Sequence, residues 1–193
     1  MNQLDLLAYV AGTLEDLRIP YMLVGSYASG TYGEPRMTRD IDMVVQLNPA
    51  QVEGLCARFD AREFYIRPEA ARQAVVRGGQ FNILHPSSGN KVDLIAARQD
   101  AWGRTQMARR QRIRALPDQD IWVARPEDII LSKMLYYKEG GSEKHLRDIV
   151  GILKIAAEDI DRDDVSHWAA ELDVTDVWHA VLRRLESSLP GNR

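Results

Sequence analysis

The stretch that decides the fold is YMLVGSYASGTYGEPRMTRDIDMVV, residues 21–45. Its first four residues, Tyr21–Val24, are apolar, which predicts a short buried strand. Gly25 ends this run, because glycine permits a tight turn and the close approach of a phosphate. Ser26 then begins a short helical segment, where its hydroxyl can cap the helix or bind a phosphate oxygen. Capping is the commoner role of such a serine, so the turn indicates a function only together with the strand after it.

The next strand of this stretch carries two acids. Side chains alternate along a strand, so Asp40 and Asp42 share one side of the segment Asp40–Val45, about 7 Å apart. Alone, such acids could face water at a sheet edge. A third acid, Asp93, lies inside the apolar run Val92–Ile95 and is therefore predicted on another strand. Aspartates on adjacent strands can bind two Mg²⁺ ions, which stabilise the attacking and leaving oxygens of a phosphoryl displacement.

The periodicity of the whole chain predicts an α+β fold. Apolar residues at helical spacing predict helices over 4–17, 26–32, 49–59, 69–76, 127–138, 143–157, 161–171 and 175–189. Further strands are predicted over 81–85, 91–95 and 121–124, with a turn-rich hairpin loop over 85–90. The boundary is expected near Ala124-Arg125. A mixed core domain over 1–124 would precede it, and a C-terminal helical region over 125–193 would follow.

The composition excludes several classes of protein. The chain has 193 residues, of which 45% are hydrophobic and 27% charged, enough for one ordinary core with a small appendage. The single cysteine, Cys56, permits no intrachain disulfide and no cysteine-based zinc site, and the four histidines lack metal-ligand spacing. No signal peptide, membrane anchor or membrane-spanning run is predicted, so the cytoplasm is the expected location.

Charge is uneven along the chain although the net charge is only -3. Five arginines crowd one short stretch, namely Arg104, Arg109, Arg110, Arg112 and Arg114. Such a cluster is more often a solvated face than a contact surface for a phosphate backbone, and both interpretations stay open here. RNA binding by this stretch would weaken steeply with salt.

These motifs resemble the polymerase-beta-like nucleotidyltransferase superfamily. Its pattern is Gly-[Ser/Gly], a gap that often holds Arg or Thr, Asp-x-[Asp/Glu], and a later acid on a strand. Over residues 21–96 the matching positions are Gly25-Ser26, Arg36, Thr38, Asp40, Asp42 and Asp93. A narrower resemblance points to the minimal nucleotidyltransferases and the AbiEii-type toxins of type IV toxin–antitoxin systems. It rests on the segment 126–133, which ends at Lys133, and on Lys144–Asp148, where His145 replaces the first aspartate of that motif.

The resemblance implies a nucleotidyltransferase fold, with a small mixed sheet flanked by helices. It implies that a nucleoside monophosphate moves from a nucleoside triphosphate to a hydroxyl acceptor, with release of pyrophosphate. Two Mg²⁺ ions are implied, for which Mn²⁺ could substitute. Asp40 and Asp42 would bind both ions, and Asp93 would bind the catalytic ion and help to deprotonate the acceptor.

The resemblance also implies which residues hold the nucleotide. Gly25, Ser26 and the helix that begins there would hold the β- and γ-phosphates. Charge neutralisation in the transition state and further nucleotide contacts would come from Arg36, Thr38, Lys133 and Asp148. Within this set Asp148 could orient Lys133 through an ion pair, although a purely structural salt bridge between two helices explains the pair equally well.

The acceptor stays open at this stage. The arginine-rich stretch would suit RNA, including tRNA ends, and a small hydroxylated molecule, as in antibiotic nucleotidyltransferases, is the alternative. A protein side chain would also provide a hydroxyl. The AbiEii-type resemblance further raises a role as a toxin with a cognate antitoxin. In the contrasting hypothesis, the chain is a non-catalytic nucleotide-binding or antitoxin-like module, in which replacement of Asp40 would change nothing.

Overall fold

The computed structural model describes residues 1–34, 38 and 40–188 of the chain, so the prediction for Arg36 lies outside the described part. The chain forms two compact units. Unit 1 contains Met1–Tyr27 and the described residues from 38 to 124, and unit 2 contains residues 28–34 and the described residues from Arg125 onward. Whether residues 1–124 and 125–193 fold as separate domains stays a prediction.

A mixed sheet of seven described strands forms the centre of unit 1, in the spatial order β3-β4-β5-β2-β1-β7-β6. β2 runs parallel to β5, β1 runs parallel to β7, and the other neighbours are antiparallel. The bounds are β1 Tyr21–Val24, β2 Asp40–Val45, β3 Tyr65–Ile66, β4 Gln80–His85, β5 Asn90–Ala96, β6 Gln111–Ile113 and β7 Ile121–Val123.

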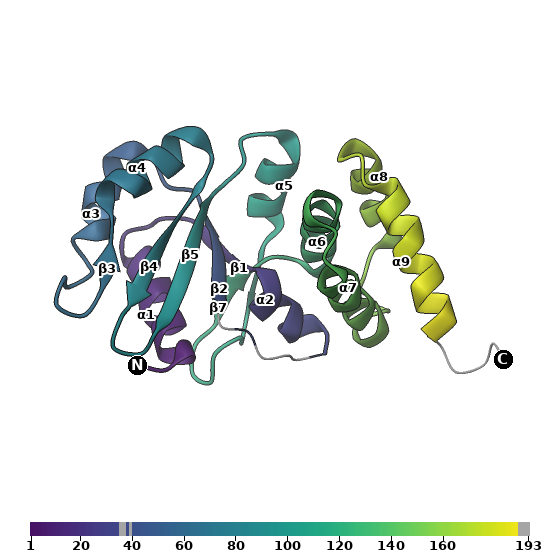
Figure 1. The fold of residues 1–193 in the computed structure, drawn as a ribbon, viewed down its shortest axis with the longest axis horizontal. Helices are drawn as coiled ribbons and strands as arrows, with labels where there is room; N and C mark the ends of the chain where they lie inside the picture. Colours follow the sequence, from purple (N-terminus) through teal and green to yellow (C-terminus); the bar gives the residue numbers. More distant parts are fainter. Residues whose placement is uncertain (35–37, 39, 189–193) are drawn as a thin grey trace. The chain divides into compact units, whose positions relative to one another are not determined.

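Five helical segments accompany this sheet. They are α1 Gln3–Asp16, the 3₁₀ turn η1 Pro49–Gln51, α3 Val52–Cys56, α4 Pro68–Arg77 and α5 Ala101–Arg109. α1 begins at a capping box, because the Asn2 side chain accepts from the Asp5 backbone while the Asp5 carboxylate accepts from Asn2. Its buried face covers the sheet near β5, and Figure 1 shows it behind the strands.

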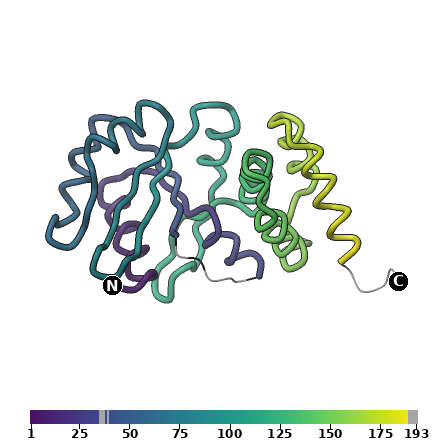
Figure 2. Tube along the Cα trace, in the orientation of Figure 1, coloured from purple at the N-terminus to yellow at the C-terminus, as the bar shows by residue number. Residues whose placement is uncertain are grey.

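The alternation of side chains divides β2 and β5 into a buried and an open face. Ile41, Met43 and Val45 are 0–1% exposed, and they lie in register with buried residues of β5, whereas Asp40 and Asp42 face the other side. β4 and β5 form a hairpin, which Figure 2 shows as a tight reversal of the Cα trace. The apolar core therefore fixes the face on which the acids are presented.

Unit 2 is helical. It contains the later part of α2 (Gly25–Tyr32), followed by α6 Pro126–Gly140, α7 Glu143–Ile155, α8 Arg162–Glu171 and α9 Thr175–Ser188. α6 begins with proline at its first turn and is capped after its last residue by Gly141, whose φ of 65° suits glycine. α7 and α9 pack against each other and against α6. In the described residues no helix has the length and hydropathy needed to cross a bilayer.

The predicted α+β class is confirmed, while three elements were not predicted: β3, α5 and β6. α5 has weak apolar periodicity, yet Asp100 caps it by accepting from the Gly103 backbone at 2.8 Å, and Trp102 and Met107 are buried on its inner side. β6 is formed by a short polar segment whose strand conformation comes from pairing with β7. These elements depend on tertiary contacts that local periodicity does not reveal.

Candidate active site

The predicted acids of unit 1 come together on neighbouring strands. Because β2 and β5 are parallel and in register, Asp42 lies directly beside Asp93, and Asp40 lies beside Lys91. Asp40, Asp42 and Asp93 share the open side of these two strands, since the alternate positions are packed in the core. The Asp93 side chain is 11% exposed, against 52% for Asp40. The three carboxylates thus range from a largely desolvated position to a solvated one.

Gly25 lies at the end of β1, next to Asp42. β1 is antiparallel to β2, and Val24 is the partner of Asp42, so the turn after Val24 passes beside that carboxylate. Gly25 has φ 68°, in the left-handed region. A Cβ added at this position would also collide with the Asp42 side chain. Backbone conformation and close approach therefore both require glycine, and Ser26 follows as the second residue of α2.

Lys91 is a member of this site that the sequence analysis missed. Its Nζ donates to Asp93 Oδ2 at 2.8 Å and lies 3.3 Å from Asp40 Oδ1. The hydrogen bond to Asp93 is the main reason that the pKa of Lys91 is raised above its usual value. A signal for this contact was present, because Lys91 and Asp93 are two residues apart on a predicted strand and must share one side of it.

Thr38 forms hydrogen bonds just before the start of β2. Its Oγ1 donates to the Asp40 carbonyl at 3.2 Å, and its own carbonyl accepts from the Gln3 side chain at 2.9 Å. Its hydroxyl is thus used on the backbone of the strand that carries the acids. The predicted contact of Thr38 with a nucleotide stays a prediction.

The donor chemistry of the site fits a divalent cation. Among the described residues, no group of three or more acids, histidines or cysteines is drawn close enough to hold a metal ion. Instead the Lys91 ammonium lies between Asp40 and Asp93 and provides the positive charge that adjacent carboxylates need. The oxygens that surround this ammonium group are of the kind that Mg²⁺ prefers as ligands.

Lys133 and Asp148, the remaining predicted site residues, belong to unit 2. Lys133 on α6 donates to Asp148 on α7, with 2.6 Å between Nζ and Oδ2. The two side chains are 3% and 9% exposed. The expected ion pair is therefore present, in a largely buried position between two helices. Whether Lys133 also serves a nucleotide stays a prediction.

Comparisons with known proteins identify the fold. No protein-family model matches the chain, and no curated protein sequence matches it. The solved structure of the antibiotic-resistance factor ANT(2'')-Ia is similar, with a TM-score of 0.57 at 13% identity over 96% of this chain and 95% of that one. ANT(2'')-Ia in complex with adenylyl-2''-tobramycin gives a TM-score of 0.57 at 15% identity over 89% and 97%.

Two further solved structures agree. The lincomycin-bound lincosamide antibiotic adenylyltransferase LnuA has a TM-score of 0.51 at 15% identity over 77% of this chain and 95% of that one. An antigenic nucleotidyltransferase-like protein from Paracoccidioides brasiliensis has a TM-score of 0.52 at 20% identity over 79% and 76%. The chain therefore has the fold of these nucleotidyltransferases. The narrower AbiEii-type resemblance stays a prediction.

Proposed function

We propose that this protein is a metal-dependent nucleotidyltransferase, which moves a nucleoside monophosphate from a nucleoside triphosphate to a hydroxyl acceptor and releases pyrophosphate. The observation that carries the proposal is the register of Asp42 with Asp93, beside Asp40 and next to the Gly25 turn. In a nucleotidyltransferase fold this arrangement gathers carboxylates and a glycine turn at one end of the sheet. A fold likeness alone would not specify a reaction, because function depends on the site.

Each residue has a definite role in the proposal. Asp40, Asp42 and Asp93 would hold two Mg²⁺ ions, or Mn²⁺, which supply charge neutralisation for phosphoryl transfer. Lys91 would have to leave Asp40 and Asp93 for these oxygens to become ligands. Gly25 lets the turn pass directly against the Asp42 carboxylate, and the N-terminus of α2 would offer backbone N–H groups to the phosphates. Asp93, as the most buried of the three, would accept the proton of the attacking hydroxyl.

The further nucleotide contacts proposed from the sequence are Arg36, Thr38, Lys133 and Asp148. Lys133 would neutralise phosphate charge, and the 2.6 Å ion pair with Asp148 would orient it. The buried position of that pair makes the orienting role physically reasonable, because a desolvated ion pair holds its geometry more firmly than an exposed one.

Two acceptor classes follow from different observations. RNA, including a tRNA end, is supported by the positive charge of the stretch from Arg104 to Arg114. A small hydroxylated molecule is supported by the solved complex of ANT(2'')-Ia with adenylyl-2''-tobramycin. Salt separates them: transfer to RNA would fall steeply as the salt concentration rises, and transfer to a small molecule would not.

The first test is a thermal melt with each of the four ribonucleoside triphosphates, with and without Mg²⁺. A ligand that binds only the folded state raises the melting temperature by mass action. We expect a magnesium-dependent rise that disappears in Asp40→Asn and Asp93→Asn. Asp118→Asn is the matched control, because this exposed acid precedes β7, which runs parallel to β1, and so lies at the opposite end of the sheet from Gly25.

The outcome decides between catalysis and binding. Absence of any shift at millimolar nucleotide would exclude the transferase proposal. A nucleotide shift that survives Asp40→Asn, without transfer to RNA or small hydroxyls, would favour the non-catalytic or antitoxin-like module. A toxin role rests on the AbiEii-type resemblance alone. It predicts growth arrest on expression that Asp40→Asn relieves and that a cognate antitoxin prevents.

A further inference from the structure

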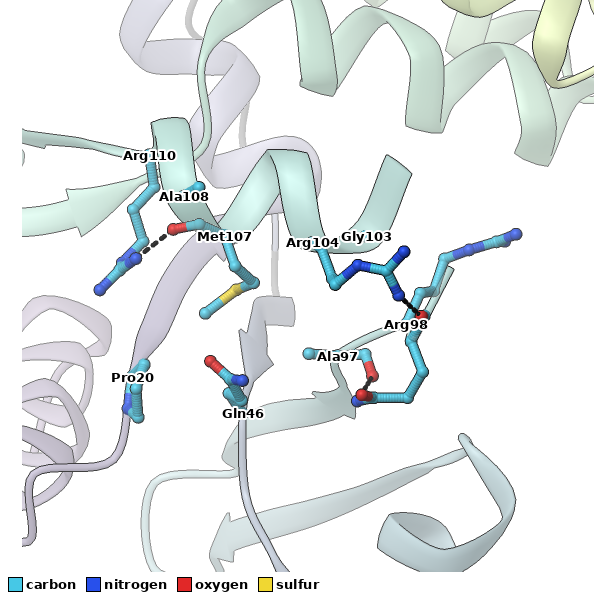
Figure 3. Close-up of a pocket in the computed structure, with 10 residues that line it drawn as sticks. Pro20, Gln46, Ala97, Arg98, Gly103, Arg104, Met107, Ala108 and Arg110 are labelled. Carbon is cyan, nitrogen blue, oxygen red and sulfur yellow. Dashed lines mark hydrogen bonds between the residues drawn. The ribbon is translucent and has the colours of Figure 1, made fainter. Parts of the chain in front are cut away.

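A pocket of about 240 Å³ opens at one end of the unit 1 sheet (Figure 3). One side is formed where three strands meet the loops: Pro20 precedes β1, Gln46 follows β2 and Ala97 follows β5. The other side is α5, from which Met107 extends toward Gln46 in Figure 3. Three arginines and no acidic residue line this pocket.

The pocket is separate from the acids of the candidate active site. In the β1–β2 pair, Val24 and Asp42 are partners at one end, and Tyr21 and Val45 are partners at the other. The Gln46 backbone continues this pairing by donating to Pro20 at 2.8 Å. Gln46 is four residues beyond Asp42, about 13 Å along the strand at the usual rise per residue. A single phosphate group cannot occupy both places.

The arginines of the pocket differ in how their charge is balanced. Arg98 is paired with Asp100, with 2.5 Å between Nη2 and Oδ2, and in Figure 3 its guanidinium turns away from the middle of the pocket. Arg104 donates to the Gln99 carbonyl, and Arg110 donates to the Met107 carbonyl. Carbonyl oxygens orient a guanidinium without neutralising it. In the described part of the chain neither Arg104 nor Arg110 forms a salt bridge.

Arg110 carries its charge in a half-buried position. Its guanidinium lies 4.5 Å from the ring centre of Trp122, and its Nε is buried without a hydrogen-bond partner among the described residues. Burial lowers the pKa of Arg110 because desolvation disfavours the charged form. The Met107 carbonyl and the Trp122 ring contact this cation, but no carboxylate among the described residues neutralises it, so its charge remains available to an anionic ligand in the pocket.

We propose that this pocket binds a phosphate group, held by Arg104 and Arg110 with the Gln46 amide as a further hydrogen-bonding group. Guanidinium groups recognise phosphate oxygens through paired N–H donors, and Arg104 and Arg110 supply such donors toward the two ends of the α5 wall of the cavity. The volume lies below the roughly 300 Å³ at which pockets for drug-sized molecules begin. The ligand is therefore an anion of phosphate or pyrophosphate size, or one phosphate of an RNA strand whose remainder lies outside.

This inference does not rest on the proposed transferase activity. The pocket contains none of the carboxylates of the candidate active site, so binding requires no divalent cation and should persist in Asp40→Asn. Measurements in EDTA separate the two sites, because acids without a metal repel a phosphate while the arginines still attract it.

The experiment is a thermal melt of the full chain in EDTA, with sodium phosphate or pyrophosphate against sodium chloride at equal ionic strength. We expect a saturable rise in melting temperature for the wild type and Asp40→Asn, which Arg104→Gln and Arg110→Gln abolish. The matched control is Arg114→Gln, which removes the same charge from an exposed arginine that does not line the pocket and pairs with Asp120. Arg104 is exposed, so its replacement should fold even if Arg110→Gln does not.

A second arm titrates a fluorescent single-stranded oligoribonucleotide in EDTA and measures anisotropy. If the phosphate is carried by RNA, Arg104→Gln and Arg110→Gln weaken binding about tenfold, as for the loss of a charged hydrogen bond, and Arg114→Gln weakens it clearly less. If phosphate or pyrophosphate binds and Arg104→Gln weakens that binding, the ligand is a free anion. If only RNA binds and Arg104→Gln weakens that binding, the ligand is a phosphate of an RNA strand. No binding in either arm, or equal losses in Arg114→Gln and Arg104→Gln, overturns the proposal.

Discussion

Lys91 Nζ lies 2.8 Å from Asp93 Oδ2, and the same nitrogen lies 3.3 Å from Asp40 Oδ1. Two carboxylates on adjacent strands repel each other, and this lysine offsets the repulsion in the absence of another cation. A divalent cation that uses the same oxygens must displace the ammonium group. Lys91 and the proposed metal ion would therefore compete for Asp40 and Asp93.

Replacement of Lys91 by methionine should lower the stability of the metal-free protein, and added metal should remove this difference from the wild type. In EDTA, Lys91→Met should be less stable by about 1 kcal/mol, because largely buried Asp93 loses a charged hydrogen bond that is partly screened by solvent. Added Mg²⁺ should restore the loss. Affinity for Mn²⁺, measured by electron paramagnetic resonance without nucleotide, should rise about tenfold as repulsion between the two cations disappears.

Lys154→Met is the control for Lys91→Met, since it removes an exposed lysine from α7 in unit 2. It should leave the Mn²⁺ affinity unchanged. Weaker Mn²⁺ binding in Lys91→Met would contradict competition, and would show instead that the lysine supports the cation site.

Gly25→Ala should destabilise the protein by about 2 kcal/mol or more. Alanine is strained at the φ of 68° found here, and its Cβ would collide with the Asp42 carboxylate. Urea unfolding measures the effect. The cost of Gly25→Ala should be smaller in an Asp42→Gly background, because the collision is then removed while the backbone strain remains.

The control for this substitution is Gly12→Ala in the middle of α1, where an added Cβ meets no atom within 4 Å. Alanine is the better helix former, so stability should rise by about 0.5–1 kcal/mol. Equal effects at Gly12 and Gly25 would show that the turn after β1 is not sterically confined.

Lys133→Met should destabilise the protein by about 3 kcal/mol in urea unfolding, because it removes an ion-pair partner from the largely buried Asp148 carboxylate. The double variant Lys133→Met/Asp148→Leu should recover much of the loss, since apolar side chains of similar volume can replace a buried ion pair. Recovery of stability without recovery of nucleotide binding would show that Lys133 serves the nucleotide. Recovery of both would show that the pair is structural.

Tyr21 should make the protein sensitive to alkali. Burial, together with a hydrogen bond to Glu15, raises the pKa of Tyr21 above its usual value of 10.0. Below pH 10 both folded and unfolded states keep the phenol proton, and above it the unfolded state loses the proton first. The free energy of unfolding therefore falls as the pH rises beyond 10, by up to about 1.4 kcal/mol for each pH unit from this group.

Tyr21→Phe isolates that contribution from those of the other tyrosines. At pH 7 the variant should be about 1 kcal/mol less stable, because the 2.9 Å hydrogen bond from the phenol to Glu15 is lost. The difference from wild type should shrink or reverse between pH 10 and 12 in urea unfolding. Parallel curves for the two proteins over that interval would contradict a raised pKa.

The bounds of a strand were predictable where they follow from the pattern of apolar and polar side chains in neighbouring residues. Tyr21–Val24 and Asp40–Val45 are strands with the predicted bounds, because apolar side chains at every position or at every second position have few other ways to be buried. The same alternation determined that Asp40 and Asp42 share a side. By contrast, α5 was missed, since its buried Trp102 and Met107 do not form a continuous helical stripe.

The sequence by itself therefore determined the presence of the strands, the face that each acid takes, and the glycine that ends β1. Only the tertiary structure decided that Asp42 lies beside Asp93 and that Lys91 lies between Asp93 and Asp40. It also decided that Lys133 pairs with Asp148. The physical reason is that alternation is a property of neighbouring residues, whereas register is set by backbone hydrogen bonds between strands some fifty residues apart in the chain.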